Sequence, residues 1–564
     1  GAGMNGRAAR APVGARGGRG ASGAPVRVAA IDVGSNAVRL RIAEVLPRGG
    51  VRVVADKRQT TRLGQRLSST GRLPEEAIEQ SVEAVAAYRA LCDEFGVRRM
   101  RAVATAAVRE ASNGGEFLRR VRERCGQELE VISADEEARI ALRNIRSAFD
   151  LQGQRVAAID IGGGSVQVVL SVDGVIVDLC SMPLGAVRLT EMFASAGNFR
   201  EERYQELKRY VQRVIDQNLG EPAFTPGLVV GTGGTFSTAS GLIGPSRVRS
   251  TPGKAGAESV GVATPEPLRM RRAQLSRLLE RLRVMSHTAR AHVKGMPPDR
   301  ADIIVPGLVV VERLLRHLGA EKAAAHEGGI RQGVVLLLAD EVRAAAGTVR
   351  GRGGEPARGG GLVNAARALA LRCRSPREHV EHVAAQALRL FDALAAHEGT
   401  RVAMERHGAL GEGARELLHA AALLHDSGVL VEYRRHHKHS ASIIRHATLP
   451  GLDAERTAVL ACVARYHRRA MPSPRHAEFA ALSHGAKLLV QCLAAILRVA
   501  DGLDHDHTQR VRVAGVGLSR VPDQRVLRVR VRARGTVGEC VEAAESKGDL
   551  FAEVFDLEPV VEVG

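Results

Sequence analysis

Two glycine-rich segments, each led by an aspartate, are the residues of this sequence best suited to phosphate chemistry. They read Asp-Val-Gly-Ser-Asn at 32–36 and Asp-Ile-Gly-Gly-Gly-Ser at 160–165, and Gly-Thr-Gly-Gly-Thr at 231–235 is similar. Backbone N–H groups that glycine exposes beside a hydroxyl bind anions, and a carboxylate binds Mg²⁺. One such loop alone could be a simple tight turn, but two in register and a third favour a phosphate site. The expected phosphate-binding residues are Gly34, Ser35, Asn36, Gly162, Gly163, Gly164, Ser165, Gly233, Gly234 and Thr235, with Asp32 and Asp160 for Mg²⁺.

The first two segments belong to an internal repeat. RVAAIDVGSNAVRLRI at 27–42 and RVAAIDIGGGSVQVVL at 155–170 agree at eight of sixteen positions. In each copy the glycine turn is followed by a second β-rich run, which predicts a hairpin. A dinucleotide fold would open a helix there, so a dinucleotide site is disfavoured. Two copies of one α/β unit predict two lobes with a ligand cleft between them.

The 564 residues are too many for one hydrophobic core, and low-complexity stretches suggest where to divide them. We expect a disordered basic tail at 1–25, one lobe at 26–150, a second at 151–343 and a flexible linker at 344–361. A helical domain at 362–510 and a small α+β domain at 511–564 follow, with strands at 511–516, 526–533 and 553–563 and one helix near 537–550. Fifteen of the nineteen histidines lie between 379 and 507, so the helical domain has chemistry of its own.

The amino-acid composition limits which classes of function this protein can have. No apolar run is long enough to span a bilayer, and the seven scattered cysteines fit a reducing cytoplasm. The net charge of +19 indicates either a polyanionic partner or an arginine-rich composition, since only 8 of the 81 basic residues are lysine. Aromatic residues make up only 3%, so base-stacking nucleic-acid binding is not expected.

Seven separated motifs resemble the Ppx/GppA phosphatase family, which comprises exopolyphosphatases and guanosine pentaphosphate phosphohydrolases of the actin-like (sugar kinase/Hsp70/actin) superfamily. They are IDVGSNAVRL at 31, VATAAVREASN at 103, ISADEEARIA at 132, AAIDIGGGSVQVV at 157, VGTGGTFSTAS at 230, ADIIVPG at 301 and EGGIRQGV at 327. The resemblance implies an α/β fold of two actin-like lobes, Mg²⁺ and a homodimer.

The resemblance also assigns the catalytic residues. Ser133 and Glu136 have capping-box spacing at a helix start, which leaves Glu137 free to be the family's general base. Arg109 is expected to grip the terminal phosphate. Family members usually have Glu where this chain has Gln167, and an amide binds Mg²⁺ more weakly than a carboxylate.

The histidine-rich part resembles the HD-like helical domain of longer family members, through LLHDSG at 423, HHKHSASII at 436, ARYHRRA at 464 and LRVADGLD at 497. His379, His425, Asp426 and Asp501 follow the order of a metal-binding HD site, which implies a divalent transition metal. His437, His439 and His467 match further family positions.

Together these features favour a Mg²⁺-dependent hydrolase that releases orthophosphate from the end of inorganic polyphosphate. The alternatives are 5′-phosphate removal from guanosine pentaphosphate (pppGpp), a nucleotide-dependent kinase of the same superfamily, and a weakly active polyphosphate or alarmone (ppGpp, pppGpp) binder. No nucleic-acid partner and no membrane span are expected.

Overall fold

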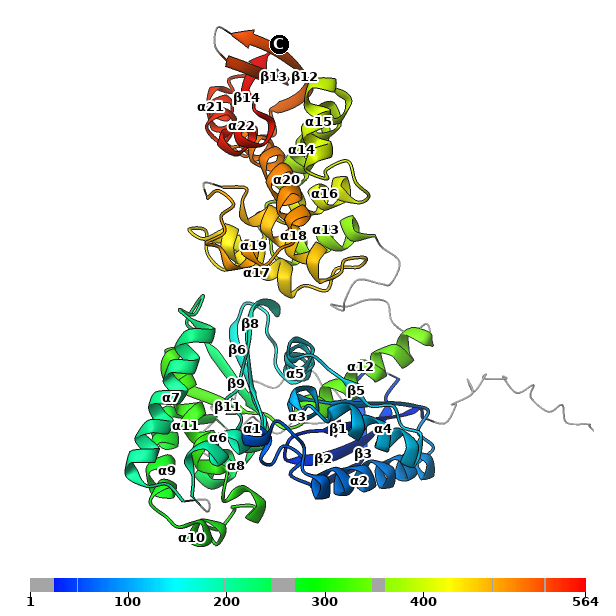
Figure 1. Ribbon diagram of the computed structural model, residues 1–564, viewed down its shortest axis with the longest axis vertical. Helices are drawn as coiled ribbons and strands as arrows, with labels where there is room; N and C mark the ends of the chain where they lie inside the picture. Colours follow the sequence, from blue (N-terminus) through cyan, green and yellow to red (C-terminus); the bar gives the residue numbers. More distant parts are fainter. Residues whose placement is uncertain are drawn as a thin grey trace, which may run out of the picture.

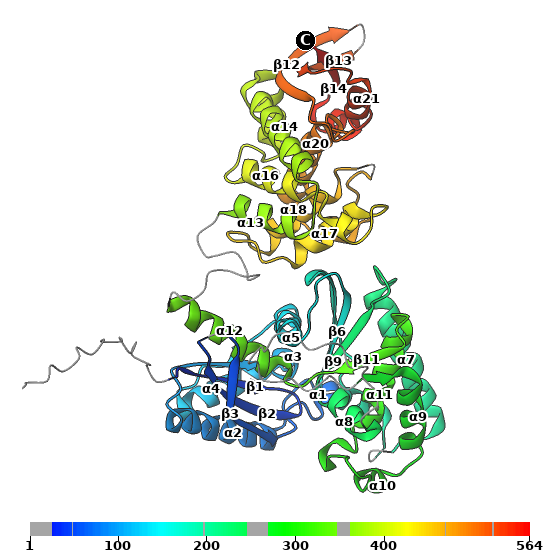
Figure 2. The ribbon, with the colours of Figure 1, turned by 180° about the vertical axis from the view of Figure 1, so that it is seen from behind.

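Two α/β lobes lie side by side in this computed structural model, and a helical domain lies beyond them along the long axis (Figures 1 and 2). The structure describes residues 25–47, 49–195, 198–244, 269–346, 361–468, 470–521 and 524–564. The expected basic tail, apart from residue 25, and most of the expected linker lie outside the described residues.

The first lobe is a five-stranded mixed sheet in the order β3-β2-β1-β4-β5, with helices on both faces. Its strands are β1 (Arg27–Val33), β2 (Ala37–Val45), β3 (Val51–Thr60), β4 (Arg99–Ala104) and β5 (Glu130–Val131). Its helices are α1 (Leu67–Thr70), α2 (Glu75–Glu94), α3 (Ala106–Glu110), α4 (Gly114–Cys125) and α5 (Ala134–Ala148). β1 and β2 form the expected antiparallel hairpin, and apolar residues of α2 and α4 pack on one face of the sheet.

The second lobe repeats this plan in a six-stranded sheet of order β10-β11-β9-β6-β7-β8. Its strands are β6 (Arg155–Ile161), β7 (Val166–Val172), β8 (Val175–Met182), β9 (Leu228–Thr232), β10 (Arg269–Arg271) and β11 (Lys322–Ala325). Its helices are α6 (Ala186–Phe193), α7 (Glu201–Leu219), α8 (Gly234–Ile243), α9 (Arg272–Arg283), α10 (His287–Ala291), a 3₁₀ turn (Pro298–Arg300), α11 (Ile304–His317) and α12 (Gly329–Ala345). β6 and β7 form the second expected antiparallel hairpin.

Helices α5 and α12 pack against each other and join the lobes. Ile330, Val334 and Leu338 of α12 share a core with Val28 and Ala30 of the first sheet. The expected second lobe, 151–343, includes these α12 residues, but the structure packs them on the first lobe. The other side of α5 packs on the second sheet. Each of these two helices therefore also packs on the lobe to which the sequence did not assign it.

The rest of the chain forms the helical domain and a small sheet packed on its end (Figure 1). Its helices are α13 (Leu362–Arg372), α14 (Arg377–Ala396), α15 (Glu398–Arg406), α16 (Ala414–Leu424), a 3₁₀ turn (Ser427–Leu430), α17 (His436–His446), α18 (Ala454–Arg465), α19 (Ala477–Ala480) and α20 (His484–Gly502). The end piece has β12 (Val511–Val521), β13 (Gln524–Ala533), α21 (Gly538–Ser546), α22 (Asp549–Phe555) and β14 (Glu558–Val563), with strand order β12-β13-β14. Among the described residues, no helix is long and apolar enough to cross a membrane.

The expected strand at 553–563 is wrong over its first residues, where α22 ends. Leu550, Phe551, Val554 and Phe555 are buried at helical spacing, so their apolar run serves a helix and not a strand.

The close contact of α5 with α12 generates a stability prediction. A Cβ at Gly333 of α12 would lie 2.3 Å from the carbonyl oxygen of Ile140 in α5. We expect Gly333→Ala to lower the free energy of unfolding by about 1–3 kcal/mol, because neither backbone can give way. Gly115→Ala in α4 is the control, since its Cβ would meet nothing within 4 Å. Urea unfolding of both variants checks this, and a Gly333→Ala protein as stable as its parent would contradict the close helix contact.

Candidate active site

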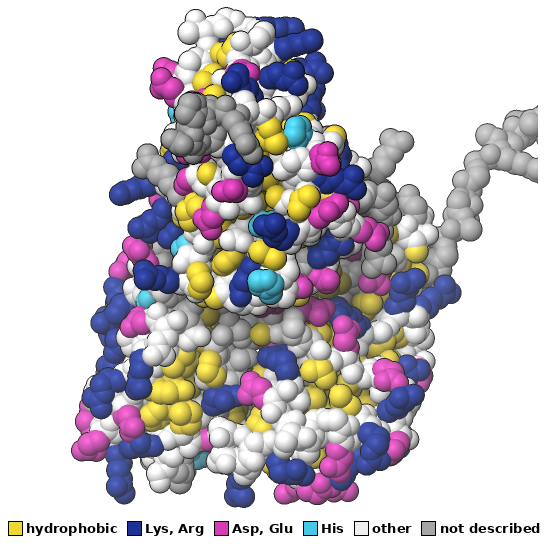
Figure 3. Space-filling view, turned by 45° about the horizontal axis from the view of Figure 1, so that its top comes forward, with side chains coloured by type: hydrophobic (Ala, Val, Ile, Leu, Met, Phe, Trp, Pro, Cys, Tyr) yellow, Lys and Arg dark blue, Asp and Glu magenta, His cyan; other side chains and the backbone are white. Residues whose placement is uncertain are grey.

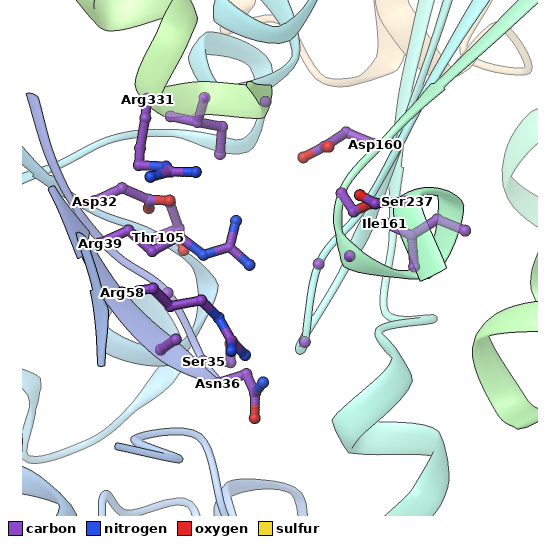
Figure 4. A pocket seen from close by; sticks show the side chains of 18 of the residues that line it. Asp32, Ser35, Asn36, Arg39, Arg58, Thr105, Asp160, Ile161, Ser237 and Arg331 are labelled. Carbon is purple, nitrogen blue, oxygen red and sulfur yellow. The ribbon is translucent and has the colours of Figure 1, made fainter. Parts of the chain in front are cut away.

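A cleft of about 390 Å³ lies between the two lobes (Figure 4). It is lined by both hairpin turns, the loop after β9 and the start of α12. The expected site residues that line it are Asp32, Gly34, Ser35, Asn36, Glu137, Asp160, Gly162, Gly163, Gly164, Ser165, Gly233 and Gly234. The structure thus brings together twelve residues that lie up to 202 positions apart in the sequence.

The two hairpin turns face each other across the cleft. A Cβ at Gly163 would lie 2.9 Å from the Cβ of Ser35, and a Cβ at Gly164 would lie 3.0 Å from the Ser35 hydroxyl. These glycines therefore let two turns approach closely, and they also leave backbone N–H groups exposed to an anion.

The loop after β9 supplies Gly233 and Gly234 but not Thr235. Gly233 has φ +91°, and a Cβ at Gly234 would lie 2.0 Å from the guanidinium of Arg300, which fills that place. Thr235 does not line the cleft: it is buried, and its hydroxyl lies 2.6 Å from where a Cβ of Gly307 in α11 would be. The first turn of α8 directs this side chain toward α11, so Thr235 is not brought together with the other expected phosphate-binding residues. Ser237 and Thr238, one turn further along α8, line the cleft instead.

Asp32 and Asp160 end the two equivalent strands and approach the cleft from opposite lobes (Figure 4). Burial raises the pKa of both carboxyls above the usual range. Thr232 donates a hydrogen bond to Asp160, while one oxygen of Asp32 has no hydrogen-bond partner among the described residues. A free, buried carboxylate oxygen beside a second carboxylate is the donor set that Mg²⁺ prefers, so these residues fit that ion.

Glu137 lies in the first turn of α5, and its carboxyl is 4% exposed. Ser133 caps this helix by accepting a hydrogen bond from the Glu136 N–H at 3.1 Å. One Glu137 oxygen accepts no hydrogen bond from the described residues. Burial, with a smaller contribution from Asp160, raises the pKa of Glu137 to about 8. A carboxyl with such a pKa is suited to accept a proton near neutral pH.

Glu136 differs from the expectation. Its carboxylate pairs with Arg101 at 2.6 Å and not with the backbone N–H of Ser133, so only half of the expected capping box is formed. The strand β4 brings Arg101 to this position, and a charged partner binds a carboxylate more strongly than a backbone amide does.

Arg109 lies beside Glu137 but does not line the cleft. Its guanidinium is 3.5 Å from a Glu137 oxygen and donates a hydrogen bond to the carbonyl of Ile132 at 2.8 Å. In this conformation Arg109 orients the start of α5 and partly offsets the rise in the Glu137 pKa. Its expected contact with the terminal phosphate stays a prediction.

Five arginines that the sequence reasoning missed line the cleft: Arg39, Arg41, Arg58, Arg300 and Arg331. Arg39 and Arg58 extend from the first lobe toward the second (Figure 4). Among the described residues, neither Arg39 nor Arg300 has a hydrogen-bond or ion-pair partner. Burial and the nearby Arg39 and Arg58 lower the pKa of Arg300 to about 10, while Arg58 pairs with Asp299 and Arg331 with Asp56.

The internal repeat contained a signal for Arg39. Arg39 lies directly opposite Asp32 in the first hairpin, as Gln167 lies opposite Asp160 in the second. The two copies therefore place a cation and a neutral amide at equivalent positions. Gln167 donates a hydrogen bond to the Ser165 hydroxyl at 2.9 Å, and its amide oxygen has no partner among the described residues.

A second cluster of polar residues lies in the helical domain, and the expected tetrad converges there. The Nε2 atoms of His379 and His425 each lie 3.5 Å from an Asp501 oxygen, and Asp426 lies 3.7 Å from both. Of the other histidines singled out, His467 joins the cluster. His437 and His439 do not, because the phase of α17 directs His436 inward instead.

Comparison with known proteins gives separate matches for the two lobes and for the helical domain. The model of the Ppx/GppA phosphatase family matches residues 41–341, and that of Ppx/GppA phosphatase, domain III, matches residues 364–532. Exopolyphosphatase 1 of Mycobacterium tuberculosis is 29% identical over 347 residues, covering 59% of this chain and 96% of the relative. Exopolyphosphatase 2 of that organism is 32% identical over 329 residues, covering 56% and 98%.

Solved structures match the two lobes. An exopolyphosphatase from Cytophaga hutchinsonii has a TM-score of 0.50 at 23% identity, covering 56% of this chain and 98% of its own. The Aquifex aeolicus member of the Ppx/GppA family has a TM-score of 0.47 at 28% identity, covering 57% and 98%. The expected fold class, with two actin-like α/β lobes, is confirmed. With a family model matching more than half of its length, the chain belongs to the Ppx/GppA phosphatase family.

Proposed function

We propose that the chain is an exopolyphosphatase, which hydrolyses the terminal phosphoanhydride bond of inorganic polyphosphate and releases orthophosphate. The observation that carries this proposal is the buried Glu137, which lines a cleft of glycine turns together with Arg39 and Arg300, two arginines without a hydrogen-bond or ion-pair partner among the described residues. Relatives named exopolyphosphatases support the same activity.

In the proposed reaction, the N–H groups of Gly163 and Gly164 and the Ser35 hydroxyl hold the terminal phosphate. Arg39 and Arg300, which form no ion pair among the described residues, hold the oxygens of the following phosphates. Glu137 orients a water and accepts its proton as the water oxygen attacks phosphorus.

Asp32 and Asp160 would hold Mg²⁺, which supplies positive charge to the phosphate oxygens when bound. Their own contribution is to place two carboxylates on either side of the reacting group, one from each lobe.

Polyphosphate is preferred over pppGpp because the cleft offers phosphate contacts but little for a base. Among the described residues that line it, none is Phe, Tyr or Trp, and His326 has the only aromatic ring. Hydrolysis of pppGpp remains the alternative activity of this site, and slow turnover with tight binding of polyphosphate or alarmone is the other.

Further proposals follow from the family. We propose that the tetrad His379, His425, Asp426 and Asp501 of the HD-like helical domain holds a divalent transition metal, because imidazole and carboxylate ligands suit such ions. We also propose that the protein acts in the cytoplasm as a homodimer. The seven unpaired cysteines support a reducing compartment.

The first prediction tests the proposed base. Phosphate release from polyphosphate, pppGpp and ATP, measured side by side, is expected to be fastest for polyphosphate. Glu137→Gln keeps the shape of the side chain but cannot accept the proton, so we expect turnover to fall at least ~10²-fold. Glu136→Gln is the matched control, because that carboxylate pairs with Arg101 at the surface and should leave turnover nearly unchanged. Equal losses in both variants would refute the assignment, and fastest release from pppGpp would move the proposal to the alternative.

The second prediction concerns pH. Below about 8 the Glu137 carboxyl is protonated and cannot act as a base, so kcat/KM should rise with pH and level off above that value. The negative charges of Asp32 and Asp160 help to raise the Glu137 pKa. Mg²⁺ held by these two residues would offset those charges, so high Mg²⁺ should move the rise in kcat/KM to lower pH. Profiles of kcat/KM against pH at low and saturating Mg²⁺ check it. The residual activity of Glu137→Gln should lack the rise, and profiles that coincide at both Mg²⁺ levels would contradict the coupling.

The third prediction concerns Gln167, whose amide oxygen lacks a partner next to Asp160. Gln167→Glu adds a carboxylate that Mg²⁺ prefers to an amide, so we expect a lower Mg²⁺ requirement and higher turnover with polyphosphate. Magnesium titrations of activity check this against Gln152→Glu, which adds the same charge at an exposed position of the second lobe. An unchanged or larger Mg²⁺ requirement in Gln167→Glu would show that this position does not limit catalysis.

A further inference from the structure

The face of the first sheet that borders the cleft carries charged side chains in two rows. The register of β2 and β3 places Arg39 opposite Arg58, and Arg41 opposite Asp56. Because side chains alternate along a strand, all four share one face, and the second row lies ~6.8 Å further from the hairpin turn. All four residues line the cleft. A carboxylate thus stands in the second row where the first row has a guanidinium.

Asp56 is bound by two arginines of the cleft. One of its oxygens accepts hydrogen bonds from Nε of Arg41, at 2.8 Å, and from Nη2 of the same side chain, and the other accepts one from Arg331 at the start of α12. The side chains of Arg41 and Arg331 are 15% and 12% exposed, so water and salt screen these pairs little. Burial alone would raise the pKa of Asp56, but Arg331 and Arg41 outweigh it and hold the pKa below its usual value. The carboxyl is therefore ionised at neutral pH.

Arg331 lies close to the centre of the cleft. Figure 4 shows its guanidinium extending into the cleft beside Asp32. Burial is the main cause of the raised Asp32 pKa, and the charges of Arg39 and Arg331 offset part of the rise. Carboxylate and phosphate oxygens accept hydrogen bonds from a guanidinium in the same forked geometry. Asp56 and a phosphate group therefore compete for the same N–H groups.

We propose that Asp56 is a specificity-determining residue that limits how many phosphates the cleft holds at once. Its carboxylate occupies Arg41 and Arg331 in place of the substrate. The first phosphates of a chain bind at Arg39 and Arg300, whereas further phosphates reach the second row only by displacing Asp56. A long chain therefore gains little over a short one. This inference rests on the proposed function, because polyphosphate is the ligand whose length it concerns.

Binding of short and long chains tests the role of Asp56. Tripolyphosphate and long-chain polyphosphate are titrated calorimetrically into full-length Glu137→Gln protein, in which turnover is blocked, with and without Asp56→Asn. An amide binds the two arginines more weakly than a carboxylate does, so we expect Kd for long-chain polyphosphate to fall about tenfold and Kd for tripolyphosphate to fall clearly less. The plot of log Kd against log salt for the long chain should steepen by ~1–2, up to one for each released arginine that contacts a phosphate.

Two further variants separate competition from net charge and from a structural role. Asp392→Asn is the matched control, because it removes the same charge from an exposed pair with Arg415 in the helical domain and should leave every Kd unchanged. Asp56→Glu keeps the carboxylate and should keep the parental preference. Asp56 makes a sharper test than Asp299, which pairs with Arg58 across the two lobes and so also affects their contact.

The outcomes distinguish this inference from the proposed function. Equal changes in Asp56→Asn and Asp392→Asn would overturn the inference, because net charge alone would then explain them. Weaker or unchanged binding in Asp56→Asn would also overturn it, since Asp56 would then hold the arginines in place for the substrate. If the parent releases no phosphate from polyphosphate, the proposed function fails, while the binding comparison still decides whether Asp56 limits anion binding.

Discussion

Three buried carboxylates face one cleft with too few partners from the protein, and much of the two-lobe structure serves to hold them there. Burial raises the pKa of Asp32, Glu137 and Asp160 together, because each lacks water and two raise the pKa of the third. Leaving such groups unpaired costs several kcal/mol in principle. A bound cation and a chain of phosphates would remove this cost, so the same imbalance that weakens the empty site strengthens ligand binding.

The duplicated hairpin shows how one backbone plan serves two purposes. Both copies place an aspartate at the end of the first strand and a polar side chain directly opposite it. In the first lobe this side chain is Arg39, which extends into the cleft as an anion ligand. In the second it is Gln167, which donates a hydrogen bond to the Ser165 hydroxyl and places no charge opposite Asp160. The first lobe thus carries positive charge, while the second offers Asp160 to a metal ion.

Local patterns predicted the parts of the site that lie next to each other in the chain. Strand, aspartate and glycine turn repeat within sixteen residues, so the hairpins could be predicted, and Glu137 follows from its helix start and the family motif. The arginines could not be predicted this way, because Arg39 and Arg300 are two of 73 arginines and only the fold brings them together. Long-range contacts also explain two differences from the expectations. Arg101 pairs with the Glu136 carboxylate, so the capping box is only half formed, and α12 packs on the first sheet although the sequence assigned it to the second lobe. His436 was missed in favour of His437 because a one-residue shift of α17 decides which ring turns inward.

For anion binding, it matters more which arginines lack a carboxylate partner than how large the net charge of the chain is. Basic and acidic side chains are mixed over much of the face in Figure 3, and most arginines in the first lobe have a carboxylate partner. Such surface pairs contribute little and are screened by salt, so they do not attract a polyanion strongly. Arg39 and Arg300 differ because both are partly buried and neither forms a hydrogen bond or ion pair with a carboxylate among the described residues, although Asp32 lies opposite Arg39 in the hairpin. A phosphate chain gains most where desolvated cations lack partners, so under the proposed function we expect polyphosphate to bind in the cleft rather than at sites set by the net charge of +19.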